Sequence, residues 1–125
     1  MNVVDSSAWL EYFADGPNAS FFAKPIERTK DLIVPSLVIY EVFKRVLQQR
    51  NETDALRAVA LMEQGRVVPL DASIALSAAR ISLAHQLPMA DSVILATTRA
   101  FGATLWTQDN DFEGMPGVQY RERKG

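Results

Sequence analysis

Four carboxylates fall at corresponding places in this sequence. Asp5 and Asp109 each follow a short apolar segment of the kind that forms a buried strand. Glu41 and Asp91 lie near the beginnings of two helical segments. Carboxylates gathered at one site repel each other, and some must protonate unless a cation neutralises them. Mg²⁺ and Mn²⁺ prefer such oxygen ligands, activate water and neutralise charge on a phosphodiester, so the acids predict metal-dependent phosphodiester chemistry if the fold brings them together.

Each acid also has an ordinary structural explanation. Asp5 has the residue type of a helix N-cap, and Asp91 would suit the same place in its own helix. Glu41 lies opposite the apolar stripe of its helix, where solvated residues are expected. Asp109 and Asp111 are typical turn residues. The cluster interpretation therefore depends on the elements that position these side chains.

Short apolar segments alternate with amphipathic helices along the chain. The expected strands are 2–4, 31–35, 66–70, 103–107 and 118–120, and the expected helices are 6–13, 18–28, 36–50, 53–64, 72–85 and 90–101. This alternation predicts an α/β fold in which helices cover both faces of a central, mostly parallel sheet of about five strands.

One edge of such a sheet would bring the acids together. In open α/β sheets the carboxyl ends of the strands meet the starts of the following helices, and ligands bind there. This edge would gather Asp5, Glu41 and Asp109. Asp91 joins them if the helices 72–85 and 90–101 form a hairpin that returns the chain to that edge.

Length and composition predict one globular domain spanning residues 1–125, with 48% hydrophobic and 22% charged residues. No apolar run approaches the roughly 20 residues of a membrane span, and Asp5 interrupts the opening apolar segment. We therefore expect no signal sequence, no membrane association and a cytoplasmic location. The net charge of −2 means that contacts with nucleic acid would be local or bridged by cations.

Several other kinds of site are disfavoured. Cysteine is absent, which excludes thiolate metal sites and thiol nucleophiles, and the single histidine, His85, lies near a helix end where surface histidines are common. The turn after the first strand, residues 5–8, contains no glycine, which argues against a dinucleotide fold and a P-loop.

Four segments match, in order and spacing, the motifs of a known family. They are 4–7, 35–42, 89–96 and 105–112. Together they resemble the PIN-domain family over essentially the whole chain, and within it the VapC-type toxins of toxin–antitoxin pairs. The resemblance implies a three-layer α/β/α fold and Mg²⁺- or Mn²⁺-dependent cleavage of RNA. The family's acidic cluster carries over to Asp5, Glu41, Asp91 and Asp109.

The resemblance also assigns roles within the site. Asp5, Asp91 and Asp109 would hold one or two metal ions, and Glu41 would hold a metal or position the attacking water. Asp111 is a weaker candidate ligand, acting through a water.

Two hydroxyl groups would support the acids. Ser6 would orient Asp5 or a metal-bound water, and Thr107 would do the same for Asp109.

Partners follow from the same resemblance. The family commonly forms homodimers, and a cognate VapB-type antitoxin neutralises the toxin. An apolar groove for the antitoxin is expected among Trp9, Tyr12, Phe13, Phe21 and Phe22. The best candidates for contacts with the RNA backbone are Lys24, Arg28, Lys44 and Arg45.

Two alternatives remain. A receiver-like signalling domain has similar alternation and a Mg²⁺ site at the same edge, and Asp71 follows the third strand where its phospho-acceptor would lie. A receiver needs an acidic pair after the first strand, but Asp5 is followed by Ser6, and the lysine expected after the last strand is matched only by Lys124 in the tail. The other alternative is a catalytically inactive binding module of the same fold.

Overall fold

Five short strands form one parallel sheet. The structure is a computed structural model and describes residues 1–124. The strands are β1 (Asn2–Val4), β2 (Leu32–Pro35), β3 (Arg66–Val68), β4 (Thr104–Thr107) and β5 (Val118–Tyr120). Their order across the sheet is β3-β2-β1-β4-β5, and every neighbouring pair is parallel. The predicted parallel sheet is confirmed.

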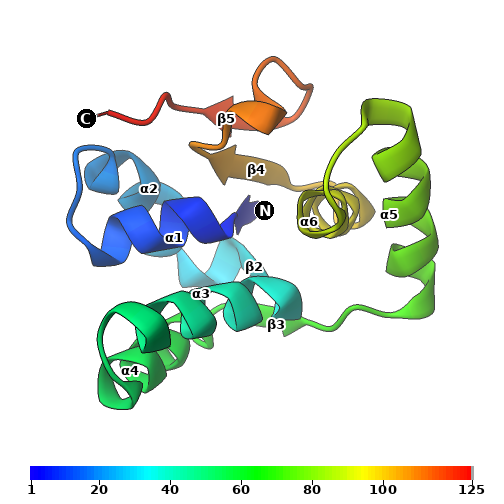
Figure 1. The fold of residues 1–125 in the computed structure, drawn as a ribbon. Coiled ribbons are helices and arrows are strands. Elements are labelled where there is room, and N and C mark those ends of the chain that lie inside the picture. Colours follow the sequence, from blue (N-terminus) through cyan, green and yellow to red (C-terminus); the bar gives the residue numbers. More distant parts are fainter. Residues whose placement is uncertain (125) are drawn as a thin grey trace.

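Helices cover both faces of this sheet. They are α1 (Ser6–Phe13), α2 (Ala19–Ile26), α3 (Ser36–Gln49), α4 (Glu52–Met62), α5 (Ala72–His85) and α6 (Met89–Ala100), with short 3₁₀ turns η1 (Thr29–Asp31) and η2 (Asn110–Phe112). In Figure 1, α1 to α4 lie mainly to the left of the strands, and α5 and α6 lie to the right. The predicted three-layer α/β/α fold is confirmed.

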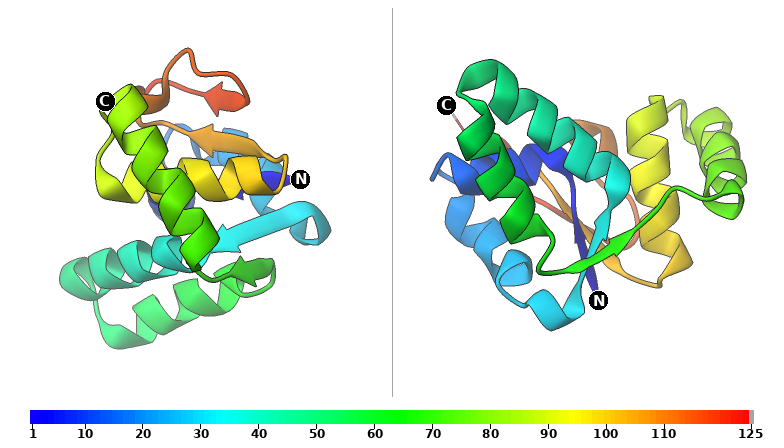
Figure 2. Two further views of the ribbon diagram at one scale, coloured as in Figure 1. Left: turned by 90° about the vertical axis from the view of Figure 1, so that its right-hand side faces the viewer. Right: turned by 90° about the horizontal axis from the view of Figure 1, so that it is seen from below.

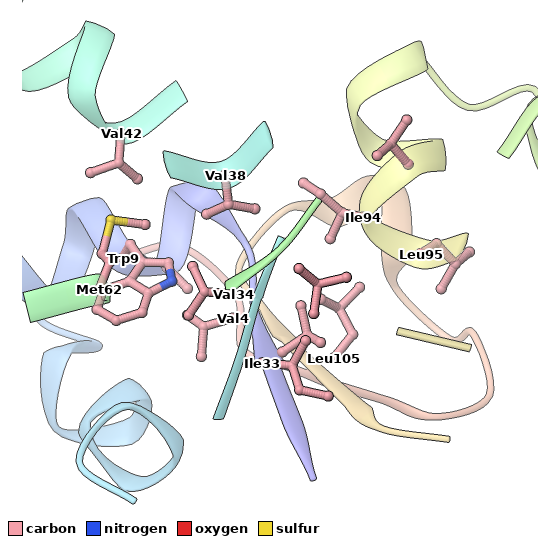
Figure 3. Packing of buried hydrophobic residues seen from close by; sticks show 14 of the residues in the cluster. Val4, Trp9, Ile33, Val34, Val38, Val42, Met62, Ile94, Leu95 and Leu105 are labelled. Carbon is pink, nitrogen blue, oxygen red and sulfur yellow. The ribbon is translucent and has the colours of Figure 1, made fainter. Parts of the chain in front are cut away.

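The core lies on both faces of the central strands. Val3 and Val4 of β1 are completely buried, as expected for a parallel strand covered on both sides. In Figure 3, Trp9 and Met62 pack on one side of the strands, and Ile94 lies on the other. Among the helices that the structure describes, none combines the length and apolar character that a membrane crossing requires.

The strand order contradicts the receiver alternative. In the doubly wound order 2-1-3-4-5 of receivers, the third strand lies beside the first. Here β3 lies at the edge of the sheet, and β2 and β4 flank β1. Asp71 follows this edge strand and caps α5, where its carboxylate accepts a hydrogen bond from the Ile74 amide at 2.9 Å.

The helices α5 and α6 form the hairpin that the position of Asp91 requires. The left-handed residue Gln86 (φ 54°) ends α5, and the hydroxyl group of Ser82 donates to the Leu87 carbonyl at 2.8 Å, which fixes the connector. In the right-hand view of Figure 2, β1 runs upward from the N-terminus and α6 runs downward toward β4. The start of α6, and Asp91 with it, therefore lies at the carboxyl edge of the sheet.

The buried face of α3 differs from the predicted one. The helical pattern predicts a core stripe of Ile39, Val42, Phe43, Val46 and Leu47. Instead Val38, Val42 and Val46 are buried, and Leu47 is 44% exposed. The stripe is rotated because α3 packs against α1 and α6 as well as α4. Glu41, three residues after Val38, is therefore half-buried rather than on the solvated face.

Candidate metal centre

Asp5 is both a helix cap and a residue of the site. Its backbone is extended where β1 ends, and its carboxylate caps α1 by accepting a hydrogen bond from the Ala8 amide at 3.0 Å. The same oxygen accepts from the Ser7 hydroxyl group at 2.9 Å, and the other oxygen accepts from the Thr107 hydroxyl group at 2.6 Å. Asp5 is only 3% exposed, so these donors hold its carboxylate in one orientation.

Thr107 connects Asp5 to the acidic turn after β4. Its hydroxyl group donates to Asp5 and accepts a hydrogen bond from the Asp109 amide at 2.9 Å. Asp109 in turn caps η2 by accepting from the Asp111 amide at 2.9 Å. One hydroxyl group therefore positions two carboxylates that are 104 residues apart in sequence.

Three carboxylates form the closest acidic group. One oxygen each of Asp91, Asp109 and Asp111 lies within 4.8 Å of the others. The sequence favours an ordinary turn role for Asp111, and the family resemblance makes it only a weaker candidate ligand that acts through a water. The 3₁₀ turn η2 brings Asp109 and Asp111 to the same side, so Asp111 belongs to this group.

Burial and like charge raise the pKa values in the site. Burial raises the pKa of Asp91 from 3.8 to about 8, and the charges of Asp109, Asp111 and Asp5 add to the rise. Burial also raises the pKa of Asp5 to about 6, against the opposing effect of its hydrogen bonds. Without a cation, Asp91 therefore keeps its proton to a higher pH than an ordinary carboxyl group does. A set of carboxylate oxygens with this excess of negative charge suits Mg²⁺ or Mn²⁺.

Glu41 lies beside the first turn of α1, outside the closest acidic group. Burial raises its pKa, and a hydrogen bond from the Ser6 side chain lowers it. Its Oε1 atom is buried and has no hydrogen-bond partner among the residues that the structure describes. The two serines thus divide differently from the prediction, because Ser7 donates to Asp5 and Ser6 faces Glu41.

The sequence matches a family model, and the fold matches solved structures. The family model described as PIN domain matches residues 3–118. This chain belongs to the PIN-domain family. No curated protein matches the sequence.

Three solved structures show the shared fold at low sequence identity. A toxin–antitoxin complex from Klebsiella pneumoniae has 19% identity and a TM-score of 0.81, and the match covers 95% of this chain and 96% of that chain. VapC20 from Mycobacterium tuberculosis, described as a sarcin–ricin loop cleaving toxin, has 17% identity and a TM-score of 0.77, with 94% and 97% covered. VapBC2 from Rickettsia felis, bound to a DNA fragment from its promoter, has 12% identity and a TM-score of 0.72, with 97% of each chain covered.

Two of the basic residues predicted to contact RNA lie at or just beyond the end of α2, which leads away from the acidic edge. Lys24 and Arg28 are exposed at the end of α2 and just beyond it. Arg28 directly precedes η1 and the start of β2, which places it toward the amino edge of the parallel sheet. An RNA contact by Arg28 stays a prediction, and this position disfavours it, because the chain must return to the amino edge before β2 can begin.

The other basic pair lies on α3, beyond Glu41. Lys44 is exposed above the ring of Tyr40, 5.6 Å from its centroid. Arg45 lines a hollow of about 340 Å³ together with Ser6 and Arg123. Arg123 was missed from the sequence because it lies in a charged tail with no periodic pattern.

Of the five aromatic residues predicted to form a groove, two lie in the core and Phe13 lines a groove with other partners. Trp9 and Phe22 belong to the core and are 1% and 0% exposed. An open groove of about 570 Å³ lies instead between α1, α3 and α4. Its apolar lining includes Leu10, Phe13 and Leu61.

Proposed function

We propose that this PIN domain is a divalent-metal-dependent endoribonuclease and the toxin of a toxin–antitoxin pair. The observation that carries the proposal is the group of Asp91, Asp109 and Asp111 oxygens within 4.8 Å of one another, with the ordered carboxylate of Asp5 close enough to raise the pKa of Asp91. The family membership supports nuclease chemistry. The description of VapC20 as a sarcin–ricin loop cleaving toxin supports RNA as the substrate.

These four carboxylates would hold Mg²⁺ or Mn²⁺. When bound, the ion supplies charge neutralisation on the scissile phosphate and lowers the pKa of a water molecule. Asp91 would hold the ion as an ionised ligand, because a cation would offset the burial and the repulsion that raise the pKa of its carboxyl group.

Residues around the ligands fix their positions. Ser7, Ala8 and Thr107 keep both oxygens of Asp5 oriented, so that this ligand needs little rearrangement. Glu41 has a different task. Its unpartnered Oε1 atom is suited to accept a hydrogen bond from a water molecule at the edge of the site, and Ser6 orients its side chain.

The antitoxin would occupy the groove between α1, α3 and α4. The apolar lining suits the buried face of an amphipathic peptide helix. Arg57 also lines the groove, whereas Arg50 is paired with Asp54 of the same lining at 2.6 Å, so Arg57 favours an acidic residue on the peptide. We propose a cytoplasmic location, where the RNA substrate and the antitoxin are both present.

A second copy of the chain would cover the outer face of α5. Leu76 and Leu83 are seven residues apart on this helix, so they project from the same side, and they are 60% and 85% exposed. Exposed leucines at this spacing suit a self-complementary contact between two copies.

Cleavage of RNA by the purified chain tests the proposed function. Total cellular RNA incubated with the protein should be cut in Mg²⁺ or Mn²⁺ and remain intact in EDTA. Asp91→Asn should abolish cleavage. Asp71→Asn is the matched control, because Asn is as good an N-cap as Asp and this residue lies on α5 away from the cluster.

Two results would count against this function. If Asp91→Asn cleaves RNA as fast as the unchanged protein, the cluster is not the active site. If the folded protein binds divalent metal but cuts no RNA under any metal condition, the inactive binding module becomes the better description.

A further inference from the structure

The segment after β5 is tied to the carboxyl edge of the sheet. The Arg121 amide donates to the Thr107 carbonyl at 3.0 Å, which extends the pairing of β4 and β5. The Arg121 guanidinium lies over the ring of Phe21, 4.3 Å from its centroid. The next residue is held as well, because the side-chain amide of Asn18 donates to the Glu122 carbonyl at 2.9 Å.

Asn18 is placed to act as an anchor. It is 1% exposed, and its side-chain NH₂ group also donates to Gln108 Oε1 at 3.1 Å. Gln108 is itself buried and its NH₂ group donates to the Ser7 carbonyl at 3.4 Å. A continuous set of buried amides therefore connects the tail at Glu122 to the turn that carries Asp5.

This anchoring places Arg123 between two hollows that flank the acidic cluster. One hollow, of about 310 Å³, is lined by Asp109 and Arg123. The other, of about 340 Å³, is lined by Ser6, Arg45 and Arg123, and also by Glu11, whose carboxylate accepts a hydrogen bond from the Asn18 backbone amide at 2.7 Å. Arg45 and Arg123 are 78 residues apart in sequence, and both border a site that is otherwise acidic.

We propose that Arg45 and Arg123 bind an RNA backbone phosphate next to the scissile one, and that Asn18 is a positioning residue that holds Arg123 there. This inference rests on the proposed function. A chain of net charge −2 with four clustered acids repels RNA as a whole, so local cations beside the cluster are needed to hold the strand. Guanidinium groups suit this task because they donate to phosphate oxygens in pairs.

Another arginine pair provides a matched control. Arg80 of α5 and Arg99 of α6 line a hollow of about 360 Å³, which resembles the first pair in charge and setting. Arg99 lies in the last turn of α6, just before β4 begins, and is therefore at the amino edge, away from the acids. A general effect of positive charge would involve both pairs equally.

Salt-dependent binding of labelled single-stranded RNA of random sequence tests this inference. The experiment uses the Asp91→Asn protein, so that the RNA is not cut. Each phosphate contact on a single strand contributes about 0.7 to the slope of log affinity against log salt. We expect Arg45→Ala and Arg123→Ala each to make this salt dependence less steep by about this amount. Arg123→Lys should retain the full slope. The Arg80→Ala/Arg99→Ala double variant should leave the slope unchanged.

A double-mutant cycle tests the role of Asn18. Asn18→Ala should lower the slope as Arg123→Ala does, and adding Arg123→Ala to Asn18→Ala should produce no further change. Thermal melting checks that each variant folds. Additive effects of the two substitutions would overturn the positioning role, because they would mean that Arg123 reaches the RNA without the anchor.

The remaining outcomes separate this inference from the proposed function. RNA binding with an unchanged slope in both Arg45→Ala and Arg123→Ala would overturn the phosphate subsite and leave the nuclease intact. A loss in these variants of binding to the antitoxin, with unchanged binding to RNA, would assign the pair to the protein partner and overturn the inference. Absence of RNA binding even at low salt would overturn both proposals.

Discussion

The two sides of the acidic site hold their carboxylates in different ways. On the side of β1 and α1, Asp5 is buried with both oxygens hydrogen-bonded to donors, so its position is fixed by the protein alone. On the side of α6 and η2, Asp91 faces Asp109 and Asp111, and their charges raise its pKa. The first side is complete as it stands, whereas the second requires a positive charge. The comparison indicates that the fold prepares half of the site and that a cation completes it.

Removing a charge from the second side should have the largest effect. Asp109→Asn removes one member of the close group and the strongest charge acting on Asp91. We expect cleavage to fall by more than about 100-fold, because even outer-shell partners of a metal contribute about 10–100-fold. In the metal-free protein, the pKa of Asp91 should fall at the same time, and NMR titration of its carboxyl group measures this. An unchanged pKa would show that Asp109 does not face Asp91.

The first side is tested by removing its hydroxyl donor. Thr107→Val keeps the shape of the side chain but leaves the buried Asp5 Oδ2 atom without this hydrogen bond. We expect cleavage to fall by about 10–100-fold and the free energy of unfolding to fall by about 1–3 kcal/mol. Thr107→Ser keeps the hydroxyl group and should retain most of both. Full activity in Thr107→Val would mean that Asp5 needs no orientation by β4.

The pH dependence of stability should show the repulsion on the second side. In the unfolded chain Asp91 ionises near 3.8, whereas in the native protein its pKa is about 8. Between these values the native state binds more protons than the unfolded state, so the free energy of unfolding falls as pH rises. Asp5, with a pKa raised from 3.8 to about 6, acts in the same direction over a narrower range.

Urea unfolding in EDTA at a series of pH values measures this trend. The Asp91→Asn protein should lose less stability as pH rises toward 8. This variant lacks the contribution of Asp91 to the pH dependence and keeps that of Asp5. Saturating Mn²⁺ should offset the loss in the unchanged protein, since the cation relieves the repulsion. Stability that increases with pH in the metal-free protein would contradict the proposed crowding of charges.

Glu41 should give the smallest effect of the series. It faces Ser6 and lies outside the closest acidic group, so Glu41→Gln should leave Mn²⁺ affinity nearly unchanged. Cleavage should fall by about tenfold or less, the low end of the range for residues that act through outer-shell contacts. Mn²⁺ titration and cleavage rates measure both quantities. Loss of metal binding in this variant would make Glu41 a ligand, one of the two roles that the family resemblance implies for it.

The sequence predicted well where most of the acids lie in the fold. Alternation of apolar and helical segments was enough to predict the parallel sheet, and a parallel sheet places Asp5 and Asp109 at one edge. The position of Asp91 depended on the direction of α5 and α6, which a short connector around the left-handed residue Gln86 determines. That geometry has no clear signal in hydrophobic periodicity.

Details that depend on packing were not predictable. The hydrophobic periodicity of α3 does not show that the buried face of the helix includes Val38. For this reason it predicts a solvent-exposed Glu41, whereas the side chain is half-buried. Ser6 and Ser7 are adjacent at the start of α1, and sequence alone does not distinguish their roles. The path of the backbone decides that Ser7 donates to Asp5. Arg123 follows the last strand in an irregular segment, and the residue before it, Glu122, accepts a hydrogen bond from Asn18 across the fold, which no sequence pattern indicates.

Mn²⁺ titration calorimetry tests the central claim most directly. The unchanged protein is compared with Asp5→Asn, Asp91→Asn and, as the matched control, Asp71→Asn. The proposed centre predicts that Asp71→Asn binds Mn²⁺ normally and that Asp91→Asn and Asp5→Asn lose or greatly weaken binding. Equal Mn²⁺ binding by all four folded proteins would contradict a metal centre built from both sides of this edge.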